Sequence, residues 1–71
     1  MKIITLKELK KLIDHRDNFE QLILRECSFK HMDLTGLDLS NIDFTLSSFQ
    51  NVKLDKVNFQ NSIVENVLFD G

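Results

Sequence analysis

One short period runs through most of the chain: from Leu22 to Gly71, apolar residues recur at every fifth position. We call these positions the centres, and every one of them is Leu, Phe or Val. The residue two positions before each centre is apolar or small, and the remaining positions are mostly polar. The centres are Leu24, Phe29, Leu34, Leu39, Phe44, Phe49, Leu54, Phe59, Val64 and Phe69.

A period of five fits neither an α-helix, which repeats at about 3.6 residues, nor a β-strand, which repeats at about 2. A sustained short period indicates a solenoid, in which each turn stacks on the previous one. Within a unit the two inward residues are two positions apart, which predicts one short extended segment. If four segments close one coil, residues twenty positions apart stack. We therefore expect Phe29, Phe49 and Phe69 to form a column of rings.

Individual units read Cys-Ser-Phe-Lys-His, Leu-Asp-Leu-Ser-Asn and Val-Asn-Phe-Gln-Asn. In these units the chain resembles the pentapeptide-repeat family, and the resemblance covers residues 22–71. It implies an all-β solenoid, a right-handed quadrilateral β-helix, here of about two and a half coils. The chain departs from the commonest family pattern by placing Val, Leu and Ile, rather than Ala, before the centres. This departure predicts a wider or less regular interior.

A helix is predicted before the repeats. Thr5 and Glu8 have the spacing of a capping box, so the helix should run from Leu6 to His15 or Arg16. Its apolar stripe should cover the first coil, because the terminal turn of a solenoid needs a cap. The stripe consists of Leu6, Leu9, Leu12 and Ile13, with Arg16 at its end.

We divide the chain into an N-terminal helix and connector at residues 1–21 and a β-helix at residues 22–71. Phe19 is expected to enter the top of the core. The corners of the coil require left-handed backbone, which Gly and Asn tolerate best. Leu46 departs from this pattern and, with Ser47 and Ser48, predicts a local irregularity. The predicted corner residues are Gly36, Asn41, Asn51, Asn61 and Asn66.

The composition restricts the setting in which the protein works. The net charge is −2, which argues against a basic nucleic-acid-binding surface. A single Cys excludes an intramolecular disulfide and agrees with a reducing compartment. We find neither an apolar run near the ~18 residues of a membrane span nor a signal peptide. The expected location is the cytoplasm, and the host cytoplasm for a phage-encoded chain.

No catalytic constellation emerges from the sequence, so we expect a non-enzymatic protein with neither cofactor nor metal. Cys27 occupies an inward position and reads as a small core residue. His31 follows it at a corner and points to a different side of the wall, which argues against a metal pair. Ser47 and Ser62 are small inward residues without a base nearby.

The acidic residues of the repeats are the first candidate site. The simplest interpretation is a solvated surface. The resemblance adds a second interpretation, because several family members resemble duplex DNA and bind topoisomerases. Small phage anti-CRISPR proteins also include DNA mimics. Our first hypothesis is an inhibitor that blocks a nucleic-acid-binding protein, either a CRISPR effector or a topoisomerase, by imitating phosphates. The proposed phosphate surrogates are Asp33, Asp38, Asp43, Asp55, Glu65 and Asp70.

The alternative hypothesis is a structural or adaptor module, for example part of a bacterial effector, that acts through apolar contacts. Ile23, Ile63 and Leu68 are outward apolar residues that would suit this role. The last coil, with Leu68 and Phe69, lacks a predicted cap. Because family members commonly dimerise end to end, the resemblance implies a homodimer through this coil.

Overall fold

The structure is a computed structural model that describes residues 1–17 and 20–71. Short strands and one helix follow one another along the chain, and Phe19 lies outside the described residues. The elements are β1 (Lys2–Ile3), α1 (Leu6–His15), β2 (Leu22–Ile23), β3 (Cys27–Lys30), β4 (Ile42–Asp43), β5 (Ser48–Gln50) and β6 (Leu68–Asp70).

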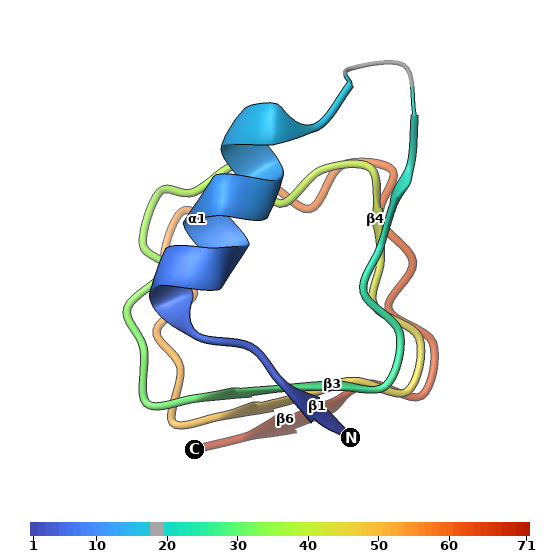
Figure 1. Ribbon diagram of the computed structural model, residues 1–71. Helices are drawn as coiled ribbons and strands as arrows, with labels where there is room; N and C mark the ends of the chain where they lie inside the picture. The colour runs from blue at the N-terminus through green and yellow to red at the C-terminus, as the bar shows by residue number, and fades with distance from the viewer. Residues whose placement is uncertain (18–19) are drawn as a thin grey trace.

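The strands of the repeats pair in parallel, always with a shift of twenty residues. Phe29 in β3 is in register with Phe49 in β5, which is in register with Phe69 in β6. β2 and β4 pair with the same shift, and isolated bridges such as Asp33 to Lys53 continue it on other sides. The trace encloses a four-sided outline (Figure 1). The expected β-helix-like arrangement of parallel strands is thereby confirmed.

β1 extends this arrangement by one strand outside the period. The sheet order is β1-β3-β5-β6, and Ile3 pairs with Ser28 at a separation of twenty-five residues. This register sets Ile4 beside Phe29, and Ile4 is buried. The first residues of the chain therefore lengthen both the sheet and the core.

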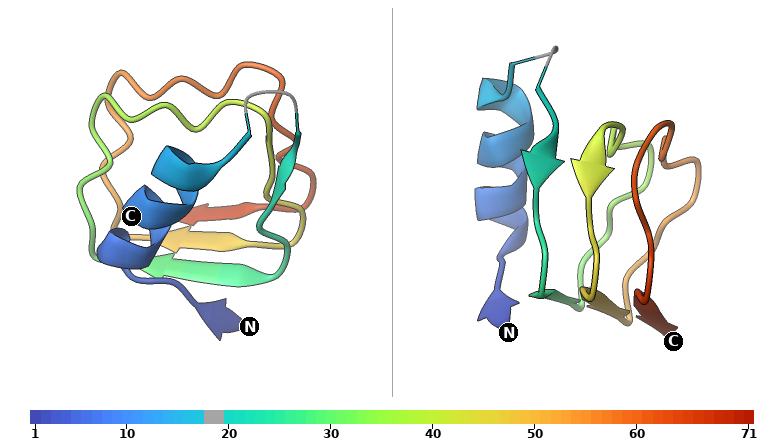
Figure 2. Two further views of the ribbon diagram at one scale, coloured as in Figure 1. Left: turned by 45° about the horizontal axis from the view of Figure 1, so that its top comes forward. Right: turned by 90° about the vertical axis from the view of Figure 1, so that its right-hand side faces the viewer.

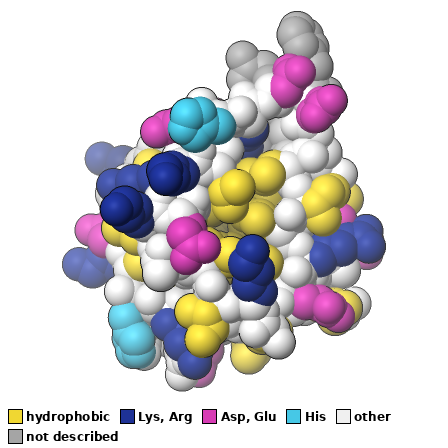
Figure 3. Space-filling model, in the orientation of Figure 1, with side chains coloured by type: hydrophobic (Ala, Val, Ile, Leu, Met, Phe, Trp, Pro, Cys, Tyr) yellow, Lys and Arg dark blue, Asp and Glu magenta, His cyan; other side chains and the backbone are white. Residues whose placement is uncertain are grey.

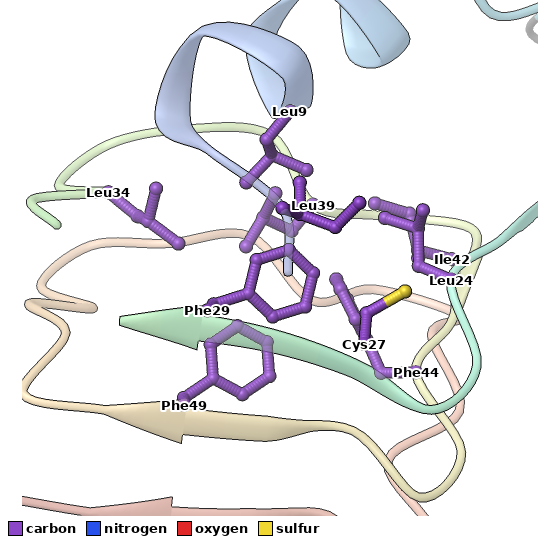
Figure 4. Close-up of a cluster of buried hydrophobic side chains, with 10 residues drawn as sticks. Leu9, Leu24, Cys27, Phe29, Leu34, Leu39, Ile42, Phe44 and Phe49 are labelled. Atoms are coloured by element: carbon purple, nitrogen blue, oxygen red, sulfur yellow. The ribbon is translucent and has the colours of Figure 1, made fainter. Parts of the chain in front are cut away.

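The core contains the predicted column of rings. The centroids of Phe29 and Phe49 lie 4.8 Å apart at an interplanar angle of 13°, and those of Phe49 and Phe69 lie 5.2 Å apart at 8°. Phe44 meets Phe49 edge-on at 5.3 Å. Figure 4 shows Phe29 and Phe49 stacked, with Leu9 of α1 above them. The core is thus made from several coils and the helix together.

A left-handed residue occurs at every fifth position of the repeats. The predicted Gly and Asn corners are confirmed, since each has a positive φ. Leu46 also has a positive φ, of 64°, so the predicted irregularity there is wrong. The left-handed conformation costs a non-glycine residue roughly 1–2 kcal/mol, and the hydrogen bonds between coils must offset this cost. These residues are Glu26, His31, Gly36, Asn41, Leu46, Asn51, Lys56, Asn61, Asn66 and Gly71.

α1 has the predicted bounds and the predicted capping box. The Thr5 hydroxyl accepts from the Glu8 amide at 3.1 Å. Leu9 is fully buried, whereas Leu12 is 37 % exposed, so the buried stripe is narrower than predicted. Figure 2 shows α1 lying across one end of the coil, while the strand β6 lies at the other end. The division of the chain at residues 21 and 22 stays a prediction.

Candidate interaction surfaces

Three aspartates of the repeats hold the backbone two residues ahead of them. The Thr35 amide donates to Asp33 Oδ1 at 2.9 Å, and the Thr35 hydroxyl donates to the same oxygen. Asp43 and Thr45 repeat both bonds. The Ser40 amide donates to Asp38 Oδ1 at 3.0 Å. These Asx turns make the carboxylates part of the wall. The spacing Asp-x-Thr or Asp-x-Ser is the sequence signal for them, and our sequence reasoning did not use it.

The same contacts keep these carboxylates charged. The Thr35 hydroxyl, followed by the Thr35 amide, lowers the pKa of Asp33 below its usual value. Ser40 lowers the pKa of Asp38 in the same way. A carboxylate that accepts hydrogen bonds resists protonation, because protonation would weaken those bonds. These side chains therefore remain anionic at any physiological pH.

Asp43 is covered rather than presented on the surface. It is 1 % exposed, and Arg25 Nε donates to its Oδ2. Its register neighbours on the adjacent coils are Ile23 and Ile63. Thr45 and Arg25 both lower the pKa of Asp43, and the Thr45 hydroxyl has the largest effect. Asp43 is therefore not one of the exposed carboxylates that a partner could contact.

The remaining acidic candidates do not gather at one point. Asp33 faces Lys53 of the next coil, and Asp38 Oδ2 lies 3.5 Å from Arg16 Nη2. Both carboxylates therefore have a cation beside them, and such exposed pairs contribute little to stability. The other candidates are exposed on the last coil: Asp55, Glu65 and Asp70.

Two inward serines bridge the backbone of the previous coil. Ser47 Oγ accepts from the Cys27 amide at 3.0 Å and donates to the Leu24 carbonyl at 2.6 Å. Ser62 makes the equivalent bonds to Ile42 and Leu39. Several other turns close directly, as in the bond from the Val57 amide to the Leu54 carbonyl at 3.2 Å. The hydroxyls therefore have a structural role. Our sequence reasoning identified the two residues as small and inward but missed this bonding.

The last coil ends in exposed apolar side chains. We call Leu54, Phe59, Val64 and Phe69 the open end. Val64 is 45 % exposed and Phe69 is 50 % exposed, although Phe49, one coil earlier, is buried. Leu68, which is 63 % exposed, lies on the outer face of the sheet in register with Ser48. The open end is the part of the core that no described element covers.

The described residues form no candidate metal centre. Within residues 1–17 and 20–71, His, Cys, Asp and Glu form no group of three that could hold a metal ion. Cys27 is a buried free thiol, and burial raises its pKa, so it is less reactive than an exposed cysteine. Among the helices that the structure describes, none has the length and apolar character needed to cross a bilayer.

The comparison with protein families agrees with this architecture. Residues 18–51 match the family model described as pentapeptide repeats (8 copies), and this match supports the pentapeptide-repeat family for the chain. Proteins of this family are typically structural rather than enzymatic. No curated protein and no solved structure matches the chain.

Proposed function

We propose that this chain is a non-enzymatic protein-binding module, built as a right-handed quadrilateral coil of about two and a half turns and contacting its partner through the open end. The observation that carries the proposal is the exposure of Val64 and Phe69 at the end of an otherwise buried core. Contiguous exposed apolar surface of this kind marks interaction sites in soluble proteins. Covering it would contribute roughly 25 cal/mol per Å² of apolar area.

A second candidate function is the acidic inhibitor that imitates DNA and blocks a CRISPR effector or a topoisomerase in the host cytoplasm. The observation that favours it is the fixed orientation of the exposed Asp33 and Asp38 carboxylates, whose pKa values are lowered by Thr35 and Ser40. The burial of Asp43 and the cations beside Asp33 and Asp38 weaken this candidate. For this reason we place it second.

Capture of partners on the immobilised chain separates the two functions. The apolar proposal expects a partner that is retained at high salt and lost with the Phe69→Ser variant. The mimicry proposal expects a nucleic-acid-binding protein that is released by salt and lost with the double variant Asp33→Asn, Asp38→Asn. A partner indifferent to Phe69→Ser would contradict the first proposal. Light scattering, run in parallel, tests whether the partner is a second copy.

A further inference from the structure

The two ends of the coil terminate the same hydrophobic columns. Because all pairs between coils are twenty residues apart, the column that begins at Phe29 ends at Phe69. At the first end this column is covered: α1 lies across it (Figures 2 and 4), and Leu9 is fully buried. The structure thus contains one example of what covers such an end: the strand β1, whose buried Ile4 lies beside Phe29, and the amphipathic helix α1.

The charges of the two parts are complementary. Residues 1–16 carry five basic and two acidic residues, whereas residues 17–71 carry four basic and nine acidic residues. Figure 3 shows several cationic side chains over α1 and others elsewhere on this face, with hydrophobic side chains beside the helix. An N-terminal part of net charge +3, to which α1 belongs, therefore covers a coil of net charge −5. The last coil, residues 52–71, has a net charge of −1, because three exposed carboxylates stand against two exposed lysines. These residues are Asp55, Glu65 and Asp70 against Lys53 and Lys56.

Backbone carbonyls at the ends of the coil can bind cations. At the covered end, Arg16 donates to the carbonyls of Asp38 and Ser40. Between coils, carbonyls accept amides of the next coil, for example Leu37 O from the Asn58 amide at 3.2 Å. The same register directs the carbonyls of the last coil out of the open end. These carbonyls belong to Val52, Val57, Ser62 and Val67.

From these three observations we propose that the open end binds a cationic amphipathic α-helix of a partner protein. The apolar stripe of that helix would cover Val64 and Phe69, and its Lys or Arg side chains would meet the last-coil carbonyls and carboxylates. A second copy placed end to end would instead bring together two coils of the same net charge, −1 each. This inference rests on the proposed function and specifies the chemistry of the partner.

Three fluorescent peptides of equal length test the proposal by anisotropy against the full chain. One has a Leu stripe with Lys on its polar face, the second has the same stripe with Glu, and the third is a scramble of the first. We expect the first peptide to bind at least about tenfold more tightly than the other two. Resonance shifts on binding should centre on Leu54, Phe59, Val64 and Phe69.

Variants of the chain separate the two parts of the site. Phe69→Ser should abolish binding, whereas Ile23→Ser, a change to an exposed apolar residue on another side of the coil, should leave it intact. The triple variant Asp55→Asn, Glu65→Gln, Asp70→Asn leaves the core untouched. This variant should bind the Lys peptide more weakly and the Glu peptide more tightly than the parent chain does. The test therefore stays decisive even if Phe69→Ser perturbs the fold.

Equal binding of the scrambled peptide, or resonance shifts centred on residues 1–16, would overturn the inference. So would a dimeric mass that Phe69→Ser converts to a monomer, because it would identify the occupant as a second copy. Failure of all three peptides to bind overturns the helix proposal alone. The protein-binding function is tested separately, by whether a captured partner depends on Phe69.

Discussion

At the scale of single residues, the aspartates that follow inward apolar residues bind mainly to the backbone of their own turn. Asp33, Asp38 and Asp43 each accept a backbone amide two residues ahead. In the sequence these aspartates suggest an acidic binding surface, but in the structure their first role is to stabilise the turns of the coil. Only the part of each carboxylate that remains exposed is available to a partner.

These aspartates predict how stability depends on pH. Their pKa values are lower in the folded chain than the value of about 3.9 expected when unfolded. Their contribution is therefore complete above the unfolded pKa and is lost as the pH falls through the folded pKa. The free energy of unfolding, measured with urea, should be constant from neutral pH to about pH 5. It should decrease as the pH is lowered beyond about pH 4. In the variant Thr35→Val, Thr45→Val, the acid loss should be smaller; an unchanged acid loss would contradict the role of the hydroxyls.

The inward serine at position 47 gives a second prediction. Ser47→Ala would leave the buried Leu24 carbonyl and Cys27 amide without the hydroxyl that joins them. We expect the free energy of unfolding to fall by about 1–3 kcal/mol, measured by urea denaturation. The neighbouring Ser48→Ala, which changes an outward side chain, should stay within about 0.5 kcal/mol of the parent. Equal effects at both positions would refute the bridging role.

At the scale of elements, the aromatic column links β3, β5 and β6. Phe49 is its middle ring, buried between Phe29 and Phe69. Phe49→Ala should lower the free energy of unfolding by about 3–5 kcal/mol, a large fraction of the stability of a small domain. Phe69→Ala, which removes a half-exposed ring, should cost much less. Circular dichroism during denaturation measures both, and a larger loss at Phe69 would show that its ring is covered in solution.

The C-terminal end of α1 depends on one side chain. Arg16, at the helix C-cap, donates to two carbonyls of the coil and pairs with Asp38. Hydrogen bonds from charged groups contribute about 1.5–3 kcal/mol each. We expect Arg16→Ala to speed amide exchange in α1 by roughly tenfold or more, with β3 much less affected. Arg16→Lys, which keeps the charge but loses the planar fork, should give an intermediate rate. Equal acceleration in α1 and β3 would mean global rather than local opening.

At the scale of the whole molecule, the two ends of the coil should differ in stability. α1 covers the first coil, whereas the last coil exposes Val64 and Phe69. We expect amide exchange to be slowest at Leu34 and Leu39, whose amides donate to the next coil at 2.9 and 2.8 Å, and faster at Leu68. Local opening of this kind follows the number of buried neighbours. Uniform exchange throughout the repeats would show that the coil opens only as a single unit.

The period of the sequence predicted much of this fold, because each centre depends only on neighbours at fixed separations. The ring column and the Gly and Asn corners could be read in this way, and the helix could be read from its capping box and apolar spacing. The features that the period did not predict depend on contacts between particular side chains of neighbouring coils. Asp43 is covered in part because Arg25 of the previous coil reaches it. Leu46 adopts a regular corner, with φ of 64°, and its amide donates to the Glu65 carbonyl of the next coil at 3.2 Å.

The site was less predictable than the fold. Which acidic residues are exposed, and whether the open end is exposed, depend on the side chains that cover each position. Periodicity does not supply that information. Leu12 shows the same limit within α1, since helical spacing placed it in the stripe although it is 37 % exposed. Spacing assigns a residue to a face, whereas exposure depends on how much of that face the rest of the chain reaches.

The constant shift of twenty residues has a consequence for how such a chain can lengthen. Inserting a single five-residue unit would rotate every later unit by a quarter turn, so that Phe49 would no longer lie over Phe29 and Ser47 would no longer reach the backbone of Leu24. Duplicating a block of four units restores every one of these partnerships. Growth of the gene should therefore be tolerated in steps of sixty nucleotides, and single-unit insertions should survive only beside an end.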